Sequence, residues 1–191
     1  MATRDPALKL TYDDLELWPD DGKRHEIIDG DHYVTPSPML RHQDVAGRLY
    51  FHITAFLRDH PLGWVYIAPT DVVLSPNDVV VPDLLFVSRE RQPILTPKNL
   101  QGAPDLVLEV LSNSSRRTDE VIKRKTYERF GVVEYWVADP VVDRLRIYRS
   151  KGGIFARAVE LSAEAGDSLT TPLLPGLSIP LTEIFPPFLQ S

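Results

Sequence analysis

Cysteine is missing from all 191 positions of the chain, and its absence removes several kinds of chemistry. Disulfides, thiolate metal sites and cysteine nucleophiles are excluded, and a reducing cytoplasm is the expected location. Long hydrophobic runs are missing as well: no stretch approaches transmembrane length, and the first residues lack the apolar run of a signal peptide. We therefore expect a cytoplasmic protein with no membrane partner.

Positive charge is scarce. The chain has 21 lysines and arginines against 27 aspartates and glutamates, which gives a formal net charge of −6. Indiscriminate nucleic-acid binding requires basic surface that meets phosphate, so this charge argues against it. A local basic patch can still dock a nucleic acid, and an enzyme that acts on one is not excluded. The sequence has no glycine-rich phosphate loop, no nucleophile elbow and no metal-ligand spacing of histidines.

Apolar residues, by contrast, are plentiful. They make up 43% of the chain, which is enough for a hydrophobic core without a disulfide or metal staple. A length of 191 residues fits one domain, and we expect a single domain over residues 1–191. We expect its start to be frayed and its end to be an apolar arm spaced by prolines.

Residue periodicity predicts a mixed α/β order. Asp29-Gly30 is a strong hairpin signal, because both residues tolerate positive φ. Helical spacing of apolar residues predicts short and long helices over residues 12–17, 40–58 and 114–130. Strands are expected over residues 64–69, 71–74, 79–87, 103–112, 133–140, 144–150 and 158–161. Pro82 marks an edge of the 79–87 strand or the point where its regular ladder begins. The strand–helix–strand unit over residues 105–139 requires its two strands to be parallel.

Two carboxylates stand where apolar residues are expected. Glu109 lies inside the most apolar segment, LVLEVL, and Asp83 lies inside VVVPDLLFV. A buried ionised carboxylate is costly unless it is paired, hydrogen-bonded or bound to a metal. If the two strands are neighbours, both acids meet at one rim of the sheet and repel each other unless a cation lies between them. Oxygen ligands of this kind favour Mg²⁺ or Mn²⁺ over zinc.

Lys123 is the cation that the predicted topology brings nearest to this rim. The helix after the Glu109 strand runs back across the sheet, so its first turns lie near the strand's carboxyl end. Asp119, Lys123 and Tyr127 are spaced by four and share one helix face. Lys123 can therefore reach Glu109, although a surface pair with Asp119 explains the same spacing.

The order of segments resembles a known family. HEIIDG, a helix that opens with RHQ, VVPDLLFV, GAPDLVLEVLSNSS, KRKTYERFGVVEYWVADP and the closing LLPGLSIPL follow one another over nearly the whole chain. This pattern resembles the Uma-type family of bacterial endonucleases, a branch of the PD-(D/E)XK nuclease superfamily. The resemblance implies a restriction-endonuclease-like fold: a central mixed sheet flanked by helices, with an N-terminal hairpin and C-terminal strands.

The resemblance also implies site residues. Asp83 matches the motif aspartate and Glu109 the second motif acid, and together they would hold Mg²⁺ or Mn²⁺. Leu111 stands where the superfamily pattern expects lysine, and Lys123 on the following helix matches the position to which the lysine has moved in this branch. Glu26 and His42 match further family positions and are additional candidates.

Four basic residues flank the same rim and are candidates for contacting DNA: Arg116, Arg117, Arg124 and Lys125. The implied function is Mg²⁺-dependent hydrolysis of phosphodiester bonds in DNA. Two other interpretations remain open. In the first, the chain is an inactive DNA- or protein-binding module of the same fold. In the second, it is a structural protein in which Glu109 and Lys123 form a buried ion pair. In that last case the C-terminal arm, with Phe185, Phe188 and Leu189, docks a second copy as a homodimer. The same arm fits equally well as an apolar strap over the core of its own chain.

Overall fold

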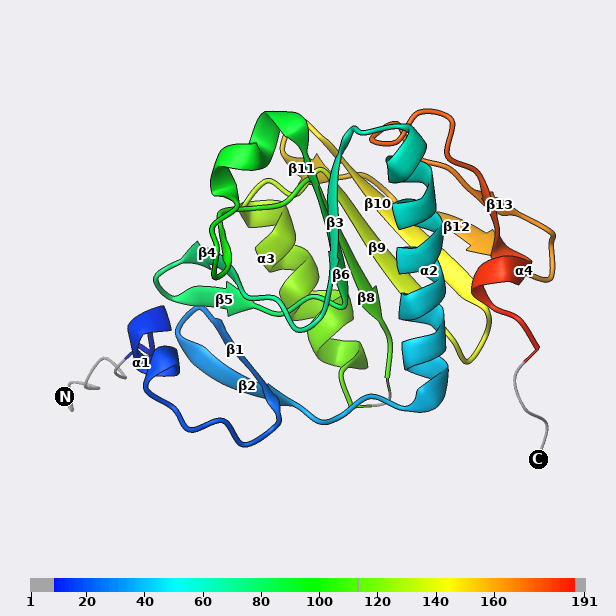
Figure 1. The fold of residues 1–191 in the computed structure, drawn as a ribbon. Coiled ribbons are helices and arrows are strands. Elements are labelled where there is room, and N and C mark those ends of the chain that lie inside the picture. Colours follow the sequence, from blue (N-terminus) through cyan, green and yellow to red (C-terminus); the bar gives the residue numbers. More distant parts are fainter. Residues whose placement is uncertain (1–8, 113, 188–191) are drawn as a thin grey trace.

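A mixed β-sheet forms the centre of the molecule in the computed structural model, which describes residues 9–112 and 114–187 (Figure 1). Its strand order is β11-β10-β9-β8-β6-β3, and β12 pairs with β10. The strands are β3 Gly63–Ile67, β6 Leu84–Ser88, β8 Leu106–Val110, β9 Glu134–Asp139, β10 Arg144–Lys151, β11 Ile154–Phe155 and β12 Val159–Ser162. β8 and β9 are parallel, as the strand–helix–strand unit predicts, and the other pairs are antiparallel.

A second sheet of order β2-β1-β5-β4-β7 lies beside the first. Its strands are β1 Arg24–Ile28, β2 Asp31–Thr35, β4 Val72–Ser75, β5 Asp78–Val80 and β7 Leu100–Gln101. The hairpin predicted at Asp29-Gly30 is confirmed, with φ of 52° and 74° at the two turn residues. Two further strands, β13 Ser168–Leu169 and β14 Ile179–Pro180, pair near the end of the chain.

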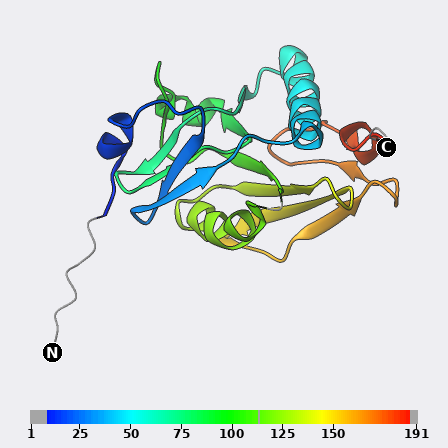
Figure 2. The same ribbon diagram turned by 90° about the horizontal axis from the view of Figure 1, so that it is seen from below.

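Helices cover both faces of the central sheet (Figure 2). The helices of the described residues are α1 Tyr12–Glu16, which packs on the second sheet, α2 Leu40–Asp59, α3 Arg124–Arg129, α4 Leu181–Ile184 and a 3₁₀ segment, Arg89–Ile94. A π-helical segment, η2 Thr118–Lys123, precedes α3, so the predicted helix over residues 114–130 is wider in its first turns than expected. α2 and α4 lie on one face, and α3 lies on the other. No helix in the described part of the chain is both long and apolar enough to cross a membrane.

One strand prediction is wrong. Residues 79–87 were expected to form a single strand, but they belong to two strands in different sheets, β5 and β6, which are separated at Pro82. Proline has no backbone N–H and cannot continue a ladder in the middle of a sheet, so the chain leaves one sheet there and enters the other. As a result Asp83 lies at the junction of the two sheets, immediately before β6.

Alternating side chains divide the central sheet into two cores. Leu84, Phe86, Leu106, Leu108 and Val110 pack on the face covered by α2. Leu85, Val87, Val107 and Leu111 pack on the opposite face with Tyr127 of α3. This is the parity that the strand period predicts. On the second face Glu109 replaces one apolar member of the row, so its carboxylate points from β8 toward α3 and the second sheet.

The apolar C-terminal arm folds back on its own chain. Phe185 is 4% exposed and belongs to the core cluster under α2. Phe188 and Leu189 lie outside the described residues. A homodimer through this arm therefore stays a prediction.

Candidate active site

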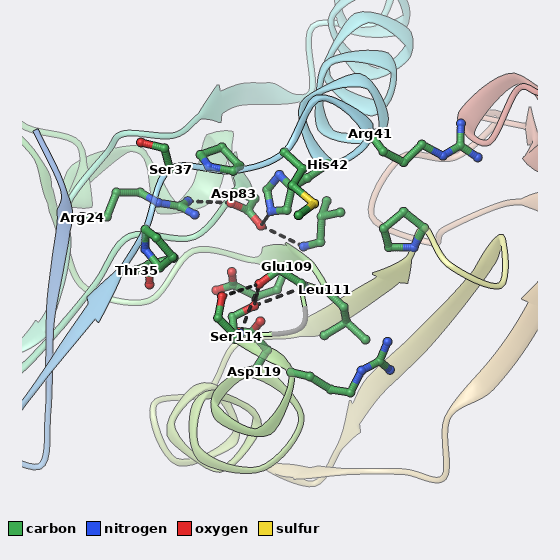
Figure 3. Close-up of a pocket in the computed structure, with 18 of the residues that line it drawn as sticks. Arg24, Thr35, Ser37, Arg41, His42, Asp83, Glu109, Leu111, Ser114 and Asp119 are labelled. Carbon is green, nitrogen blue, oxygen red and sulfur yellow. Dashed lines mark hydrogen bonds and ion pairs between the residues drawn. The ribbon is translucent and has the colours of Figure 1, made fainter. Parts of the chain in front are cut away.

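Buried acids and bases meet where the two sheets adjoin the amino end of α2 and the π-helical segment. Glu26 of β1, Asp83, Glu109 of β8, Asp119 and Lys123 are each 4% exposed or less. They surround the floor of a cavity of about 400 Å³ to which Asp83, Glu109, Asp119 and Lys123 contribute (Figure 3). The structure thus brings together residues that lie up to 97 positions apart in the sequence (Glu26 and Lys123).

Asp83 is held by three donors from three different elements. Its Oδ1 accepts a 2.6 Å hydrogen bond from Arg24 Nη1, and its Oδ2 accepts one of 2.8 Å from the backbone amide of Val110. His42 Nε2 of α2 lies 3.0 Å from the same Oδ2. Burial alone would raise the pKa of Asp83, but the hydrogen bond and charge of His42, together with Arg24, outweigh it and lower the pKa to about 2. Asp83 is therefore ionised at neutral pH.

Glu109 is held from the helix side. The register between β6 and β8 pairs Leu84 with Leu108, so Asp83 and Glu109 come at the same level of the two strands. Glu109 Oε1 accepts hydrogen bonds from Tyr127 Oη at 2.6 Å and Lys123 Nζ at 3.1 Å. Burial raises the pKa of Glu109 well above its usual range, and the neighbouring carboxylates add to the rise against the opposing charge of Lys123.

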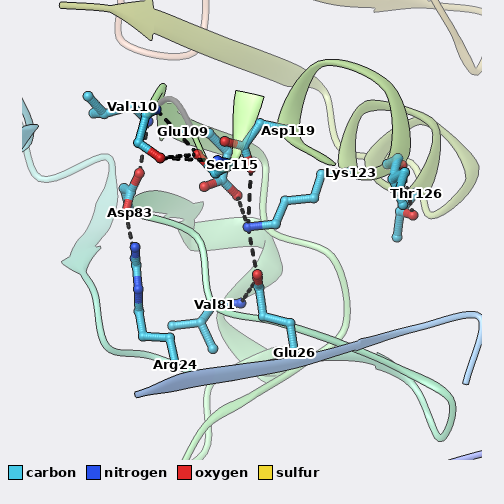
Figure 4. A network of polar contacts seen from close by, with 12 residues as sticks. Arg24, Glu26, Val81, Asp83, Glu109, Val110, Ser115, Asp119, Lys123 and Thr126 are labelled. Atoms are coloured by element: carbon cyan, nitrogen blue, oxygen red, sulfur yellow. Dashed lines mark hydrogen bonds and ion pairs between the residues drawn. The ribbon is translucent and has the colours of Figure 1, made fainter. Parts of the chain in front are cut away.

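Lys123 stands among three carboxylates (Figure 4). Its Nζ lies 2.8 Å from Glu26 Oε1, 3.1 Å from Glu109 Oε1 and 3.6 Å from Asp119 Oδ1. Burial opposes its charge, but these three acids outweigh that effect and raise the pKa of Lys123 well above its usual range. Glu26 is fixed in turn, because its Oε1 accepts a 2.7 Å hydrogen bond from the amide of Val81. Lys123 is therefore a fixed ammonium group.

Acids outnumber bases in this cluster. Glu26, Asp83, Glu109 and Asp119 face Arg24, Lys123 and His42. Burial raises the pKa of Asp119 as well as that of Glu109, which shows that the cluster disfavours its full negative charge. Carboxylate oxygens with surplus negative charge are the ligands that Mg²⁺ and Mn²⁺ prefer. In chemical type, Asp83 and Glu109 therefore fit such an ion.

The present arrangement is not that of a preformed metal site. Within the described residues, no three histidine or acidic side chains converge as a ligand set. Both oxygens of Asp83 already accept hydrogen bonds from the protein. Since each carboxylate oxygen has two lone pairs, Oδ1, which accepts from Arg24, retains a position for an ion, whereas Oδ2 faces both the amide of Val110 and His42.

The four predicted DNA contacts do not share one environment. Arg116 lines the cavity and donates to Asp139 Oδ2 at 2.8 Å. Arg117 is exposed. Arg124 lies over the ring of Tyr148, 5.4 Å from its centroid, and Lys125 lines a separate surface pocket with Arg129. Of these four predicted contacts, Arg116 alone is placed at the cavity.

Several side chains at the site were not predicted as site residues. Arg24, Arg41, Asp119 and Tyr127 all contact it or line its cavity. Arg24 stands two positions before Glu26 on the same strand, so the strand period places both side chains on one face. This spacing was the sequence signal by which Arg24 could have been identified as a site residue. His42 was expected as an additional candidate, and its Nδ1 is buried without a hydrogen-bond partner among the described residues.

Comparison with known proteins agrees with this architecture. Residues 12–182 match the model of the Uma2 family, described as "Putative restriction endonuclease". No curated protein matches the sequence. The fold is similar to a crystal structure described as "a putative nuclease belonging to DUF820", from Anabaena variabilis. The two share 18% sequence identity with a TM-score of 0.78, over 92% of this chain and 97% of that one.

The structural likeness establishes the restriction-endonuclease-like fold that the sequence pattern implied. The family match extends over nearly the whole chain and includes every element that contributes to the cavity. The chain therefore belongs to the Uma2 family of restriction-endonuclease-like proteins.

Proposed function

We propose that the protein is a metal-dependent endonuclease that hydrolyses phosphodiester bonds in DNA, with Asp83, Glu109 and Lys123 as its catalytic residues. One observation carries the proposal: two buried carboxylates at the same level of neighbouring strands share their surroundings with a buried, protonated lysine. Such a cluster is expensive to bury, and a structural role alone leaves its acid surplus unexplained. The family description and the absence of cysteine agree with a cytoplasmic nuclease.

Asp83 and Glu109 would hold Mg²⁺ or Mn²⁺, with the backbone carbonyl of Val110 as a further oxygen. When bound, the ion supplies positive charge to a phosphate oxygen and lowers the pKa of a coordinated water. Lys123 contributes a positive charge beside Glu109, which would stabilise the negative charge that develops on the phosphate. Glu26 orients the ammonium of Lys123 through the 2.8 Å contact, and Tyr127 orients Glu109.

Plasmid and single-stranded DNA cleavage tests this proposal. Wild-type protein should cleave with Mg²⁺ or Mn²⁺ and not with EDTA. Asp83→Asn and Glu109→Gln keep the shape of each side chain and should lose activity by about 100-fold or more. Glu164→Gln, which changes an exposed glutamate, is the matched control and should cleave normally. Equal cleavage by wild type and Asp83→Asn would contradict the assignment of Asp83 to the active site.

A second candidate is an inactive binding module of the same fold. Leu111 at the usual lysine position and the three protein donors around Asp83 favour it. This interpretation needs no divalent ion, so calorimetry with Mg²⁺ and Mn²⁺ separates the two. A purely structural ion pair predicts that Glu109→Gln chiefly lowers the free energy of unfolding, whereas loss of cleavage in a folded Glu109→Gln variant supports catalysis.

A further inference from the structure

The acids of the site lie at the bottom of the cavity. Asp83 and Glu109 are each 3% exposed, so a phosphodiester must enter the cavity to reach them. Its volume is about 400 Å³. A single nucleotide fits this space, whereas a base-paired strand brings its partner strand with it.

Five apolar residues line the cavity from two loop segments, with the polar Ser37 among those of the first. One side is formed by Pro36, Pro38 and Met39 from the segment between β2 and α2, and the other by Pro140 and Val141 from the turn between β9 and β10. We call these five residues the apolar rim. Met39 is 79% exposed and Val141 is 75% exposed. Exposed apolar side chains gathered at a cavity mouth are typical of a ligand-binding surface, and the flat face of a base is such a ligand.

Three arginines also line the cavity, Arg24, Arg41 and Arg116. Arg24 pairs with Asp83 at 2.6 Å. Arg41 pairs with Asp143 at 2.7 Å and Asp44 at 3.9 Å, and Arg116 pairs with Asp139 at 2.8 Å and Glu120 at 3.6 Å. Guanidinium groups bind phosphate through paired donors. Three such groups suit the phosphates on either side of one nucleotide. The net charge of −6 does not suit the many phosphate contacts by which proteins hold a long duplex.

We propose that the cavity takes one nucleotide of an unpaired DNA strand, with its base against the apolar rim and its phosphate toward Asp83, Glu109 and Lys123. The inference rests on the proposed nuclease function for the identity of the ligand. It makes single-stranded or frayed DNA the substrate, in preference to an intact duplex. Met39 and Val141 become the residues that contact the base.

Two pairs of neighbours provide matched variants. Met39 and Leu40 are adjacent and similarly exposed, as are Val141 and Val142, but only Met39 and Val141 line the cavity. Fluorescence anisotropy in EDTA, where no cleavage is expected, measures binding of a labelled oligonucleotide of about 12 nucleotides, single-stranded or as a blunt duplex. We expect the single strand to bind at least about 10-fold more tightly. Met39→Ala and Val141→Ala should each weaken it by about 5-fold, whereas Leu40→Ala and Val142→Ala should not.

The outcomes test the binding of an unpaired nucleotide in the cavity separately from the nuclease function. Equal or tighter binding of the duplex, or equal effects within each pair of variants, overturns the inference. Single-strand binding that depends on Met39 and Val141 without any cleavage in Mg²⁺ or Mn²⁺ supports the cavity assignment and overturns the nuclease. Cleavage of duplex plasmid by a protein that neither binds nor cuts single strands supports the nuclease and overturns the inference.

Discussion

Lys123 is the residue on which the buried site depends most. It is the ammonium shared by Glu26, Glu109 and Asp119, and its own side chain is 5% exposed. Removing one partner of a buried ion pair leaves charge in a low-dielectric interior, which costs more than the pair itself contributes. The three acids would then have to take up protons or draw in water.

Replacing this lysine gives the first prediction. Lys123→Ala should lower the free energy of unfolding by about 3–5 kcal/mol at neutral pH. The loss should be smaller at about pH 5, because the stranded acids are more readily protonated there. Lys125→Ala removes an exposed lysine from the same helical stretch and should change stability by less than about 0.5 kcal/mol. Urea denaturation measures both, and equal losses would show that Lys123 is not the centre of the network.

The depressed pKa of Asp83 predicts a pH dependence. A carboxylate with a lowered folded-state pKa stabilises the protein above its ordinary pKa of 3.8, and this contribution is lost as the pH falls toward the folded value of about 2. The full contribution is about 2 kcal/mol, of which about 1 kcal/mol should disappear between about pH 5 and pH 3. Asp83→Asn lacks this titration. The stability difference between wild type and Asp83→Asn should therefore narrow over that range, and a constant difference would contradict the assignment.

Residue-level prediction from sequence succeeded where an acid stood in an apolar strand. Glu109 and Asp83 conflict with their surroundings in the sequence, so their burial could be foreseen. The partners of Asp83 could not, because Arg24 lies 59 positions away and His42 lies on another element. Only the folded arrangement of both sheets and α2 brings these side chains to one carboxylate.

At the scale of elements, the local sequence pattern predicted whether a segment is a helix or a strand better than it predicted where the segment begins and ends. The hairpin at Asp29-Gly30 and α2 follow from turn chemistry and helical period, and both are present. Pro82 was expected to mark an edge or the start of the regular ladder, and β6 begins just after it. The division of residues 79–87 between two sheets was not predicted, because the apolar run continues on both sides of the proline. The π-helical turns of η2 leave no signature in residue period, since their apolar positions also fit an α-helix.

Two glycines provide an element-level prediction with an internal control. A Cβ at Gly63 of β3 would lie 2.1 Å from the carbonyl oxygen of Val87 and 2.8 Å from the ring of Phe86. Gly63→Ala should therefore force β3 away from β6 and cost about 1–3 kcal/mol. A Cβ at Gly47 of α2 meets nothing within 4 Å, so Gly47→Ala should stabilise the helix by about 0.5–1 kcal/mol. Thermal unfolding measures both, and shifts of the same sign would contradict the packing described.

At the scale of the molecule, the two sheets share a core. Ile28, Val72 and Val80 of the second sheet pack in one cluster with Leu85 and Val107 of the central sheet. The sequence predicted most strands along the chain and one parallel pair, but neither the order of the strands within a sheet nor their division between two sheets, because these depend on contacts between distant segments. We propose that residues 1–191 fold as a single domain around this shared core.

Such a domain should unfold in one transition. Far-ultraviolet circular dichroism reports on both sheets. In a Trp18→Phe variant the remaining tryptophans, Trp64 of β3 and Trp136 of β9, report by fluorescence on the central sheet. In urea the two signals should change together. Separate midpoints would show that the second sheet unfolds independently and that the chain holds two cooperative units.

Metal binding should also be visible in the stability of the whole molecule. An ion that binds the folded state at about ten times its Kd adds about 1.4 kcal/mol, or about 3–5 °C in Tm for a chain of this size. About 10 mM Mg²⁺ or Mn²⁺ should thus raise the Tm of wild type and of Glu164→Gln, but not that of Asp83→Asn. An equal rise of Tm in all three proteins would show that the ion binds at a site that does not include Asp83.

The enclosure of Lys123 by three carboxylates has a consequence for its chemical reactivity. An amine attacks acylating reagents only when it is unprotonated and accessible, and the ammonium of Lys123 is neither. Amine-directed reagents should label exposed lysines such as Lys125 first and reach Lys123 only when the cluster opens. The labelling rate of this one lysine thus reports how often the site opens, without any knowledge of the substrate.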